Sequence, residues 1–314
     1  MATLIQPRVK FVDPHRTAKG EVRASVPYTG TQTLWLNTGT LCNIQCVNCY
    51  IESSPRNDRL AYLTLADTQP FLDELDEAGE AGIEVAITGG EPFMAPEILA
   101  IMEASLARGH RVLVLTNAMQ PMMRARIKQG LLDLKAKFPG RLTLRVSLDH
   151  YTARHHDAER GEGAFAKGMT GLAWLADNQF RVDLAGRTIW GESEKDARAG
   201  YGALIAALGL DTRADDPGSL VLFPEMEAAD DPPEITTACW GILDKSPASL
   251  MCASQRMVVK RKATGRTSVA ACTLIPYDTR FDLGGTLAEA RQDVALNHPF
   301  CASFCVLGGG SCSA

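Results

Sequence analysis

Hydrophobic and polar positions follow two rhythms along the first three quarters of the chain. Short runs rich in β-branched and apolar residues predict strands, and the longer stretches between them carry apolar residues at helical spacing. The predicted strands are residues 33–37, 83–88, 111–116, 142–148, 181–185 and 219–223. The predicted helices are residues 64–78, 96–106, 123–138, 164–176 and 194–208. Strands that alternate with helices in this way are typical of a parallel sheet.

The number of repeats limits the architecture. Right-handed crossovers would curl about 200 residues of alternating strands and helices into a barrel or part of one. A full barrel of the commonest kind needs eight repeats, and the pattern predicts six. We therefore expect an α/β fold whose core is a partial (βα)6 barrel.

The pattern changes after about residue 226. The linker-like run AADDPP (228–233) is followed by short apolar runs that lack a strong helical period. We expect three regions: an N-terminal extension (1–30), the barrel core (31–228) and a small, irregular C-terminal domain (229–314).

Composition narrows the function classes. The 314 residues contain 46% hydrophobic and 22% charged side chains, which is ordinary for a globular protein and excludes disordered and collagen-like chains. No apolar run is long enough for a membrane span, and the N-terminus lacks the apolar core of a secretory signal. With 32 basic and 37 acidic residues, the net charge of −5 gives no overall attraction to nucleic acid. We expect a cytoplasmic protein without a membrane or nucleic-acid partner.

Cysteine is the informative residue type. Nine cysteines are too sparse for a disulfide scaffold and odd in number, which favours a reducing compartment and roles as metal ligands, thiols or buried hydrophobes. Three lie within eight residues, and no other cysteine occurs before residue 239. The first group is Cys42, Cys46 and Cys49, and the second is Cys239, Cys252, Cys272, Cys301, Cys305 and Cys312.

The first group has the spacing CxxxCxxC and follows the first predicted strand. Loops at the carboxyl ends of parallel strands build the active sites of barrels. Three thiolates in so short a loop can hold one face of an iron–sulfur cube and leave a fourth metal position without a protein ligand. Zinc is the alternative, although zinc sites ordinarily add a second nearby pair of ligands. Spacing alone leaves both open.

The second predicted strand ends in the sequence TGGEP (88–92). Two adjacent glycines let the backbone approach a ligand closely, and we expect Glu91 to point into the barrel mouth. Alone, this motif is equally typical of a tight turn. Directly after a CxxxCxxC loop it is far more specific.

With these two motifs, residues 33–226 resemble the radical S-adenosylmethionine (SAM) superfamily. The resemblance implies a 4Fe–4S cluster on Cys42, Cys46 and Cys49, with a fourth iron that chelates the amino and carboxylate groups of SAM. Tyr50 matches an aromatic position near the adenine. The loop of Gly89, Gly90 and Glu91 matches the segment that receives the SAM amino group.

Four polar residues near the ends of later strands are further candidates. Asn117 lies in TNA, where the family often has TNG, and Ser147 and Asp149 occupy positions where polar groups meet ribose or methionine. Arg187 is suited to a two-point grip on a carboxylate. The alternatives are a loop asparagine, a helix cap at Asp149 and a surface salt bridge at Arg187.

The resemblance implies a reaction. SAM would be split reductively into methionine and a 5′-deoxyadenosyl radical, which takes hydrogen from the substrate, with electrons from a donor such as flavodoxin or ferredoxin. A non-catalytic iron–sulfur electron carrier or redox sensor is the alternative. That alternative leaves the glycine–glutamate loop and Arg187 without a purpose.

The second cysteine group suggests another metal site, with structural cysteines or zinc as alternatives. The region resembles the twitch or SPASM extensions of the superfamily, which carry auxiliary clusters. It departs from the SPASM pattern CxxCxxxxxCxxxC because its core reads CxxxCxxxxxxC, which favours one auxiliary iron–sulfur cluster. Cys239 is expected either to lie outside the cluster or to be a thiol on the substrate side, and four ligands from the remaining five would suffice: Cys252, Cys272, Cys301, Cys305 and Cys312.

The resemblance to this superfamily limits the substrate class only in general terms. Many relatives with such tails modify ribosomally made peptides and use an additional leader-binding module. The extension over residues 1–30 has no room for one. We therefore expect a small molecule, or a peptide delivered by a separate protein.

Overall fold

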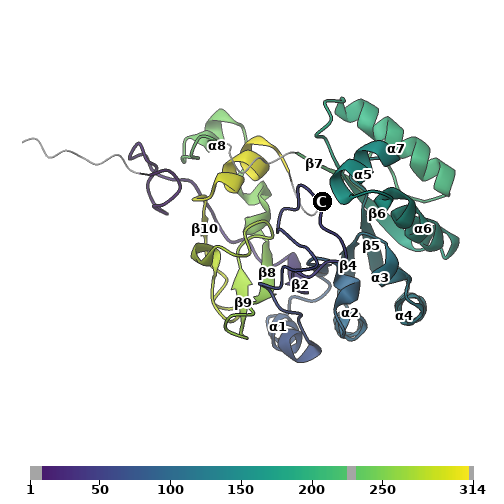
Figure 1. Cartoon of the computed structure of the whole chain (residues 1–314). Helices are drawn as coiled ribbons and strands as arrows, with labels where there is room; N and C mark the ends of the chain where they lie inside the picture. The colour runs from purple at the N-terminus through teal and green to yellow at the C-terminus, as the bar shows by residue number, and fades with distance from the viewer. Residues whose placement is uncertain (1–8, 225–230, 311–314) are drawn as a thin grey trace, which may run out of the picture.

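A mainly parallel, eight-stranded sheet forms the centre of the computed structural model, which describes residues 9–224 and 231–310 (Figure 1). Its order is β7-β6-β5-β4-β3-β2-β8-β9. Six strands correspond to the predicted ones: β2 (Thr33–Asn37), β3 (Glu84–Thr88), β4 (Arg111–Thr116), β5 (Leu142–Ser147), β6 (Arg181–Arg187) and β7 (Leu220–Phe223). Neighbours among them pair in parallel, so their carboxyl ends share one edge of the sheet.

Helices connect these strands and cover the outer face of the sheet (Figure 1). The five predicted helices are present as α1 (Leu65–Glu77), α2 (Ile98–Ala107), α4 (Ala125–Lys137), α6 (Ala164–Asp177) and α7 (Glu194–Leu208). Thr64 begins α1 with a reciprocal capping box to Asp67. Three shorter helices were not predicted: α3 (Gln120–Met123), α5 (Ala153–Arg160) and α8 (Cys239–Ile242).

Alternation along β2 explains how the sheet buries both faces. Leu34 and Leu36 pack with the covering helices in the main hydrophobic core. Trp35, between them, points to the opposite face and packs in a second cluster with residues of the C-terminal region. The second cluster lies against the concave face of the sheet, where a barrel enzyme keeps its site.

The sheet remains open because β7 and β9 lie at its two ends, and the prediction of a partial barrel is confirmed. Residues 257–260 are one of the short apolar runs that follow the linker-like run 228–233. They belong to β8 (Gln255–Lys260), which pairs in parallel with β2 and antiparallel with β9 (Thr267–Ala270). The C-terminal quarter thus extends the core sheet. The predicted boundary at 228/229 lies outside the described residues and stays a prediction.

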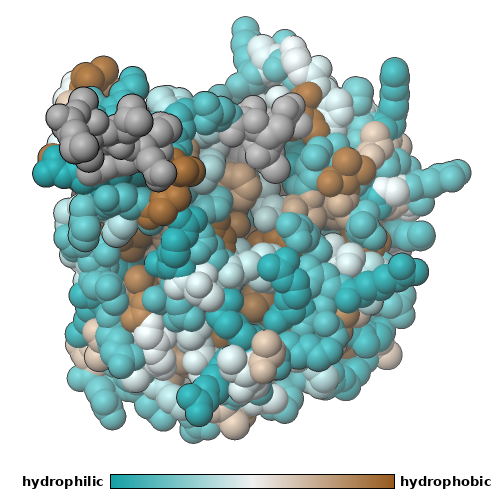
Figure 2. Space-filling view, turned by 60° about the vertical axis from the view of Figure 1, so that its left-hand side comes forward, coloured by the Kyte–Doolittle hydropathy of each residue, from teal (hydrophilic) through white to brown (hydrophobic). Residues whose placement is uncertain are grey.

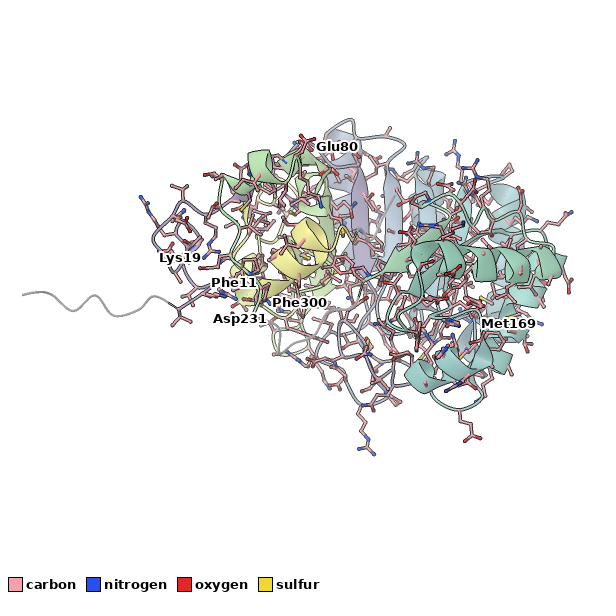
Figure 3. All side chains as sticks on the ribbon, turned by 90° about the horizontal axis from the view of Figure 1, so that it is seen from above. Phe11, Lys19, Glu80, Met169, Asp231 and Phe300 are labelled. Carbon is pink, nitrogen blue, oxygen red and sulfur yellow. The ribbon has the colours of Figure 1, made fainter. Side chains whose placement is uncertain are left out.

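The remaining C-terminal elements pack against the start of the chain. Strand β1 (Ser25–Val26) pairs with β10 (Val294–Ala295), and Phe11 shares a hydrophobic cluster with Val306. Figure 3 shows Phe11 and Phe300 at the same end of the molecule, opposite Met169 of α6. The short helical turns are η1 (Pro92–Met94), η2 (Pro247–Ser249), η3 (Met251–Ala253), η4 (Thr279–Phe281) and the π-helical η5 (Cys301–Leu307).

One face of the molecule is mainly polar (Figure 2). On the face in Figure 2, hydrophilic side chains predominate and hydrophobic ones form small groups. None of the helices within residues 9–224 and 231–310 combines the length and the apolar character needed to cross a membrane.

Candidate functional site

A cavity lies at the carboxyl ends of the parallel strands. The ends of β6 and β7 and the loops that follow β2 to β5 contribute to its walls, so residues far apart in sequence meet there. The predicted site residues that line it are Cys42, Cys46, Cys49, Tyr50, Gly89, Gly90, Asn117, Ser147, Asp149 and Arg187. Glu91 is absent from this lining.

The cysteine loop presents three free thiols to the cavity. Its start is anchored by the Cys42 amide, which donates to Ser54 O at 3.1 Å, and the Ser53 amide donates to Cys49 Sγ at 3.2 Å. Burial raises the pKa of Cys42 to about 12 and also raises the pKa of Cys46. These thiols are therefore protonated at neutral pH, and a metal must displace their protons to bind.

Binding of an iron–sulfur cube explains the arrangement of the three cysteines better than a purely structural role does. Three thiols within eight residues line one cavity, and three thiolates can hold three irons of a cube while the fourth iron has no protein ligand. Within residues 9–224 and 231–310, no group of three or more histidine, cysteine or acidic side chains could hold a single metal ion.

The two adjacent glycines pack against the start of the cysteine loop. The Gly90 amide donates to Gly39 O at 2.8 Å, and the Glu91 amide donates to Leu41 O at 3.2 Å. A Cβ at Gly90 would overlap the Leu41 carbonyl, and Gly89 has a φ of 145°. The glycines thus let the β3 loop approach the backbone that leads into Cys42.

Glu91 occupies a buried position behind the lining and is 1% exposed. Its carboxylate accepts hydrogen bonds from the Thr116 hydroxyl (2.9 and 3.1 Å) and from the backbone amides of Asn117 (2.9 Å) and Phe93 (3.2 Å). Burial raises the pKa of Glu91 to about 7 despite these bonds. Through its hydrogen bonds to Thr116 and Asn117, the Glu91 side chain holds the loop after β4 in place. The Asn117 side chain in turn donates to Asn43 of the cysteine loop at 2.9 Å.

Arg160 is a largely buried cation that the sequence patterns did not predict as a site residue. It ends α5 and lines the cavity, where its guanidinium binds both oxygens of Asp149 at 2.7 and 2.9 Å. Burial opposes ionisation of Asp149, but the charge and hydrogen bonds of Arg160 outweigh it and lower the pKa of the carboxyl. Helix α5 has little apolar periodicity, although Gly161 (φ 96°) is a recognisable stop signal after Arg160.

Arg187 lies on the other side of the same carboxylate. Its Nε is 3.5 Å from Asp149 Oδ1, and its Nη2 donates to Asn48 O at 2.5 Å. The guanidinium also lies over the ring of Tyr50, 4.6 Å from the ring centroid. Among the described residues that line the cavity, Arg160 and Arg187 are the two cations.

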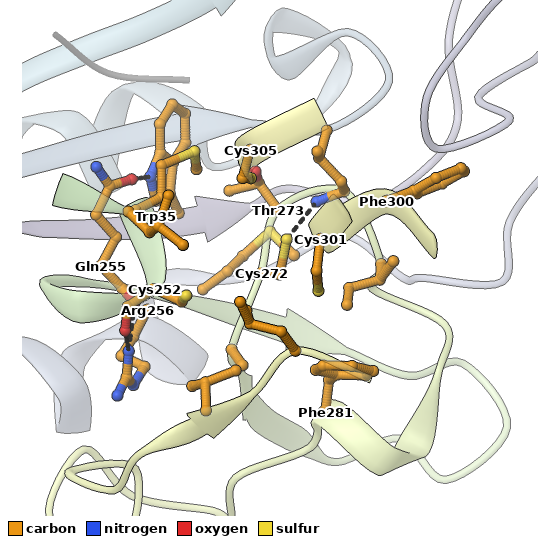
Figure 4. Close-up of a pocket in the computed structure, with 18 residues that line it drawn as sticks. Trp35, Cys252, Gln255, Arg256, Cys272, Thr273, Phe281, Phe300, Cys301 and Cys305 are labelled. Atoms are coloured by element: carbon orange, nitrogen blue, oxygen red, sulfur yellow. Dashed lines mark hydrogen bonds between the residues drawn. The ribbon is translucent and has the colours of Figure 1, made fainter. Parts of the chain in front are cut away.

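Four cysteines of the second group line another cavity in the C-terminal region (Figure 4). The described cysteines that line it are Cys252, Cys272, Cys301 and Cys305. Burial raises the pKa of Cys252 to about 12 and also raises that of Cys272. Four thiols around one largely apolar cavity fit an iron–sulfur cluster.

Two cysteines of the second group differ from these four. Cys239 does not line the cavity, and its sulfur lies 3.4 Å from the Thr236 amide, which donates to it. Cys312 lies outside the described residues.

The two cavities share a wall. Trp35, Thr273 and Leu274 line both of them, and Thr273 directly follows Cys272. The Trp35 indole N–H donates to Gln255 Oε1 at 2.8 Å, which fixes the ring in this position. The barrel cavity and the cavity of the C-terminal thiols are therefore neighbours.

Sequence relatives match the part of the chain that carries the barrel site. The chain is 32% identical over 145 residues to the antilisterial bacteriocin subtilosin biosynthesis protein AlbA of Bacillus subtilis, which covers 46% of this chain and 30% of AlbA. It is 30% identical over 145 residues to the AdoMet-dependent heme synthase of Methanosarcina barkeri, which covers 45% and 39%. The chain thus spans about a third of the length of these curated relatives.

Solved structures share the fold at low identity. Streptococcus suis SuiB bound to S-adenosylmethionine has a TM-score of 0.57 at 12% identity and covers 81% of this chain and 63% of SuiB. The enzyme anSMEcpe with bound AdoMet and Cp18Cys peptide has a TM-score of 0.57 at 13% identity and covers 82% and 79%. The family description "Radical SAM superfamily" matches residues 36–197, just over half of the chain. The chain belongs to the radical SAM superfamily.

Proposed function

We propose that the protein cleaves SAM reductively and uses the 5′-deoxyadenosyl radical to abstract hydrogen from a peptide or small-molecule substrate. Members of this superfamily use a 4Fe–4S cluster and SAM, which together supply the radical chemistry. The observation that carries the proposal is the barrel cavity, where three thiols of one loop face two buried cations and an aromatic ring.

The chain's own residues would bind and orient the cofactors. Cys42, Cys46 and Cys49 would hold the cluster and leave one iron open to SAM. Arg160 and Arg187 are positioned to attract the SAM carboxylate, because they are the cations that line the cavity in the described part of the chain. Their charges are partly balanced by Asp149, which keeps both guanidinium groups in fixed positions.

Aromatic and polar side chains would complete the site. Tyr50 lines the cavity and is held by Arg187 and by the hydrogen bond from its hydroxyl to Pro224 O at 3.1 Å. This fixed ring suits contact with the adenine. Asn117 and Ser147 line the cavity as hydrogen-bonding groups for the ribose or methionine portion.

One auxiliary iron–sulfur cluster on the C-terminal thiols is part of the proposal. Its ligands would come from Cys252, Cys272, Cys301 and Cys305, with residues 229–314 as the auxiliary region. Because the shared wall separates the two cavities, such a cluster would lie beside a substrate in the barrel. It could then exchange an electron with the substrate or bind it directly.

Support for the substrate class comes from relatives. A structure with this fold, anSMEcpe, contains a peptide together with AdoMet, and AlbA is named for the biosynthesis of a bacteriocin. We therefore place a peptide first and a small molecule second. An electron donor such as flavodoxin or ferredoxin would supply the reducing electron.

The test is anaerobic incubation of the reconstituted protein with SAM and dithionite. We expect 5′-deoxyadenosine and methionine to form, with candidate peptides increasing the rate. Cys46→Ala should abolish 5′-deoxyadenosine and lose about one cluster of iron, while the C-terminal iron persists. Absence of 5′-deoxyadenosine from iron-loaded wild-type protein would favour an electron carrier.

A further inference from the structure

Three aromatic rings from distant parts of the chain meet between the two cavities. Tyr50 follows the cysteine loop, Phe223 ends β7 and Phe304 lies in η5. The Tyr50 ring meets Phe223 and Phe304 edge-on, each with centroids 5.9 Å apart and interplanar angles of 85° and 75°. Phe223 and Phe304 are 5.8 Å apart. These distances and angles are those of favourable aromatic pairs.

Phe304 lines neither cavity. It contacts Tyr50, which lines the barrel cavity, and it lies next to Cys305, which lines the C-terminal cavity. It lies between Cys301 and Cys305 on η5, and both of these thiols line the C-terminal cavity. Its own ring is fully buried in the hydrophobic cluster that also contains Trp35. Movement of the two thiols would therefore move a ring that contacts Tyr50.

The backbone around Phe304 is held at both sides. Lys245 Nζ donates to the carbonyls of Cys305 (2.7 Å) and Val306 (3.1 Å), and the Gly310 amide donates to Phe304 O at 2.8 Å. A Cβ at Gly310 would lie 2.6 Å from the Phe304 ring. These contacts hold the backbone of η5 around Phe304. A cluster bound to Cys301 and Cys305 would restrain the same segment further.

We propose that Phe304 is a positioning residue that couples occupancy of the C-terminal thiols to the SAM affinity of the barrel cavity. The inference rests on the proposed function, since it assumes SAM in the barrel and a cluster on these cysteines. A cluster bound to Cys301 and Cys305 restrains η5, and Phe304 then holds the Tyr50 ring in its place on the cavity wall. Such coupling between two sites is reciprocal, so SAM also strengthens retention of the C-terminal cluster.

The experiment measures SAM binding to anaerobically reconstituted full-length protein by equilibrium dialysis without reductant, so that SAM is not consumed. Four proteins form a cycle: wild type, the pair Cys252→Ser and Cys272→Ser, Phe304→Leu, and all three changes together. Iron content verifies which cluster each protein holds. Phe71→Leu, a buried phenylalanine of α1 in the main core, is the matched control.

We expect loss of the C-terminal cluster to weaken SAM binding by about fivefold or more. Phe304→Leu should weaken SAM binding by roughly two- to tenfold, the range of one aromatic contact. In the Phe304→Leu background, loss of the cluster should change the affinity by less than about twofold, because the coupling is already broken. Phe71→Leu should leave the affinity at the wild-type value.

Additive effects in the cycle, or wild-type SAM affinity after loss of the C-terminal cluster, would overturn the coupling. The same holds if Phe71→Leu weakens binding as much as Phe304→Leu. Failure of iron-loaded wild type to bind SAM would instead contradict the proposed function itself. If Phe304→Leu does not fold, Phe304→Met fills similar volume without the aromatic edge and takes its place.

Discussion

Arg160 holds Asp149 by two hydrogen bonds, from Nε at 2.7 Å and from Nη2 at 2.9 Å, and both side chains are almost completely buried. Arg187 approaches the same carboxylate at 3.5 Å. One carboxylate thus organises two guanidinium groups on the cavity wall. Because the partners lie at or just after the ends of β5, α5 and β6, this ion-pair group also ties these three elements together.

Arg160→Met should therefore destabilise the protein by about 3–5 kcal/mol, because it leaves Asp149 buried without its main partner. Urea unfolding at neutral pH measures the loss. Arg160→Met combined with Asp149→Asn should recover much of the stability. Arg108→Met, which breaks a more exposed pair with Asp73, should cost no more than about 1 kcal/mol. Equal losses in the buried and exposed variants would contradict the assignment.

Gly90→Ala tests the close approach of the β3 loop to the cysteine loop. The added methyl group overlaps the Leu41 carbonyl, so one of the two backbones must move. We expect a loss of roughly 1–3 kcal/mol in the free energy of unfolding and reduced iron at the barrel site after reconstitution. Gly241→Ala, where an added Cβ meets nothing within 4 Å, is the matched control and should stay within about 0.5 kcal/mol of wild type. Wild-type iron content in Gly90→Ala would show that the loops tolerate separation.

His156 predicts a specific acid sensitivity. The His156 side chain lies on α5 and is 1% exposed, and neither ring nitrogen has a hydrogen-bond partner among the described residues. Burial, together with the charge of Arg160, lowers the pKa of His156 from 6.5 to about 4. Between these values the unfolded chain binds the proton and the folded chain does not. Stability should therefore fall as the pH falls from about 6.5 to 4, by roughly 3 kcal/mol from this residue.

His156→Leu removes that proton-binding site while keeping a buried apolar side chain beside Phe165. The difference in unfolding free energy between variant and wild type should shift in favour of the variant across this pH range. Urea unfolding at pH 7, 5.5 and 4 measures it. A difference that does not change with pH would mean that His156 is protonated in the folded protein as it is in the unfolded chain.

Cys272→Ala separates the roles of the two cysteine groups. At saturating SAM, the variant should retain part of its 5′-deoxyadenosine formation, because Cys42, Cys46 and Cys49 are unchanged. It should lose C-terminal iron and stop turnover of the true substrate. Iron analysis and product formation with candidate peptides measure the two effects. Full substrate turnover in a variant that lacks C-terminal iron would refute an essential auxiliary cluster.

Local patterns predicted most of the barrel and part of its site. The six strands and five longer helices follow from apolar spacing and caps such as Thr64, which act within a few residues of chain. The CxxxCxxC loop and the residues after β3 to β6 could be placed because parallel strands end at one edge. Arg160 could not be predicted as a site residue because its eight-residue helix has little apolar periodicity. Glu91 was expected in the cavity, but its carboxylate accepts hydrogen bonds from Thr116 and the Asn117 amide behind the cavity lining.

By itself, the sequence determined the alternating architecture and the two groups of cysteines, since spacing and composition are properties of neighbouring residues. The tertiary structure decided that β8 joins β2, that four distant cysteines surround one cavity, and that Phe304 reaches Tyr50. The pairing of β8 with β2 and the contact of Phe304 with Tyr50 each join segments more than 200 residues apart, and no local preference encodes any of the three relationships. They arise when the second hydrophobic cluster is buried against the concave face of the sheet.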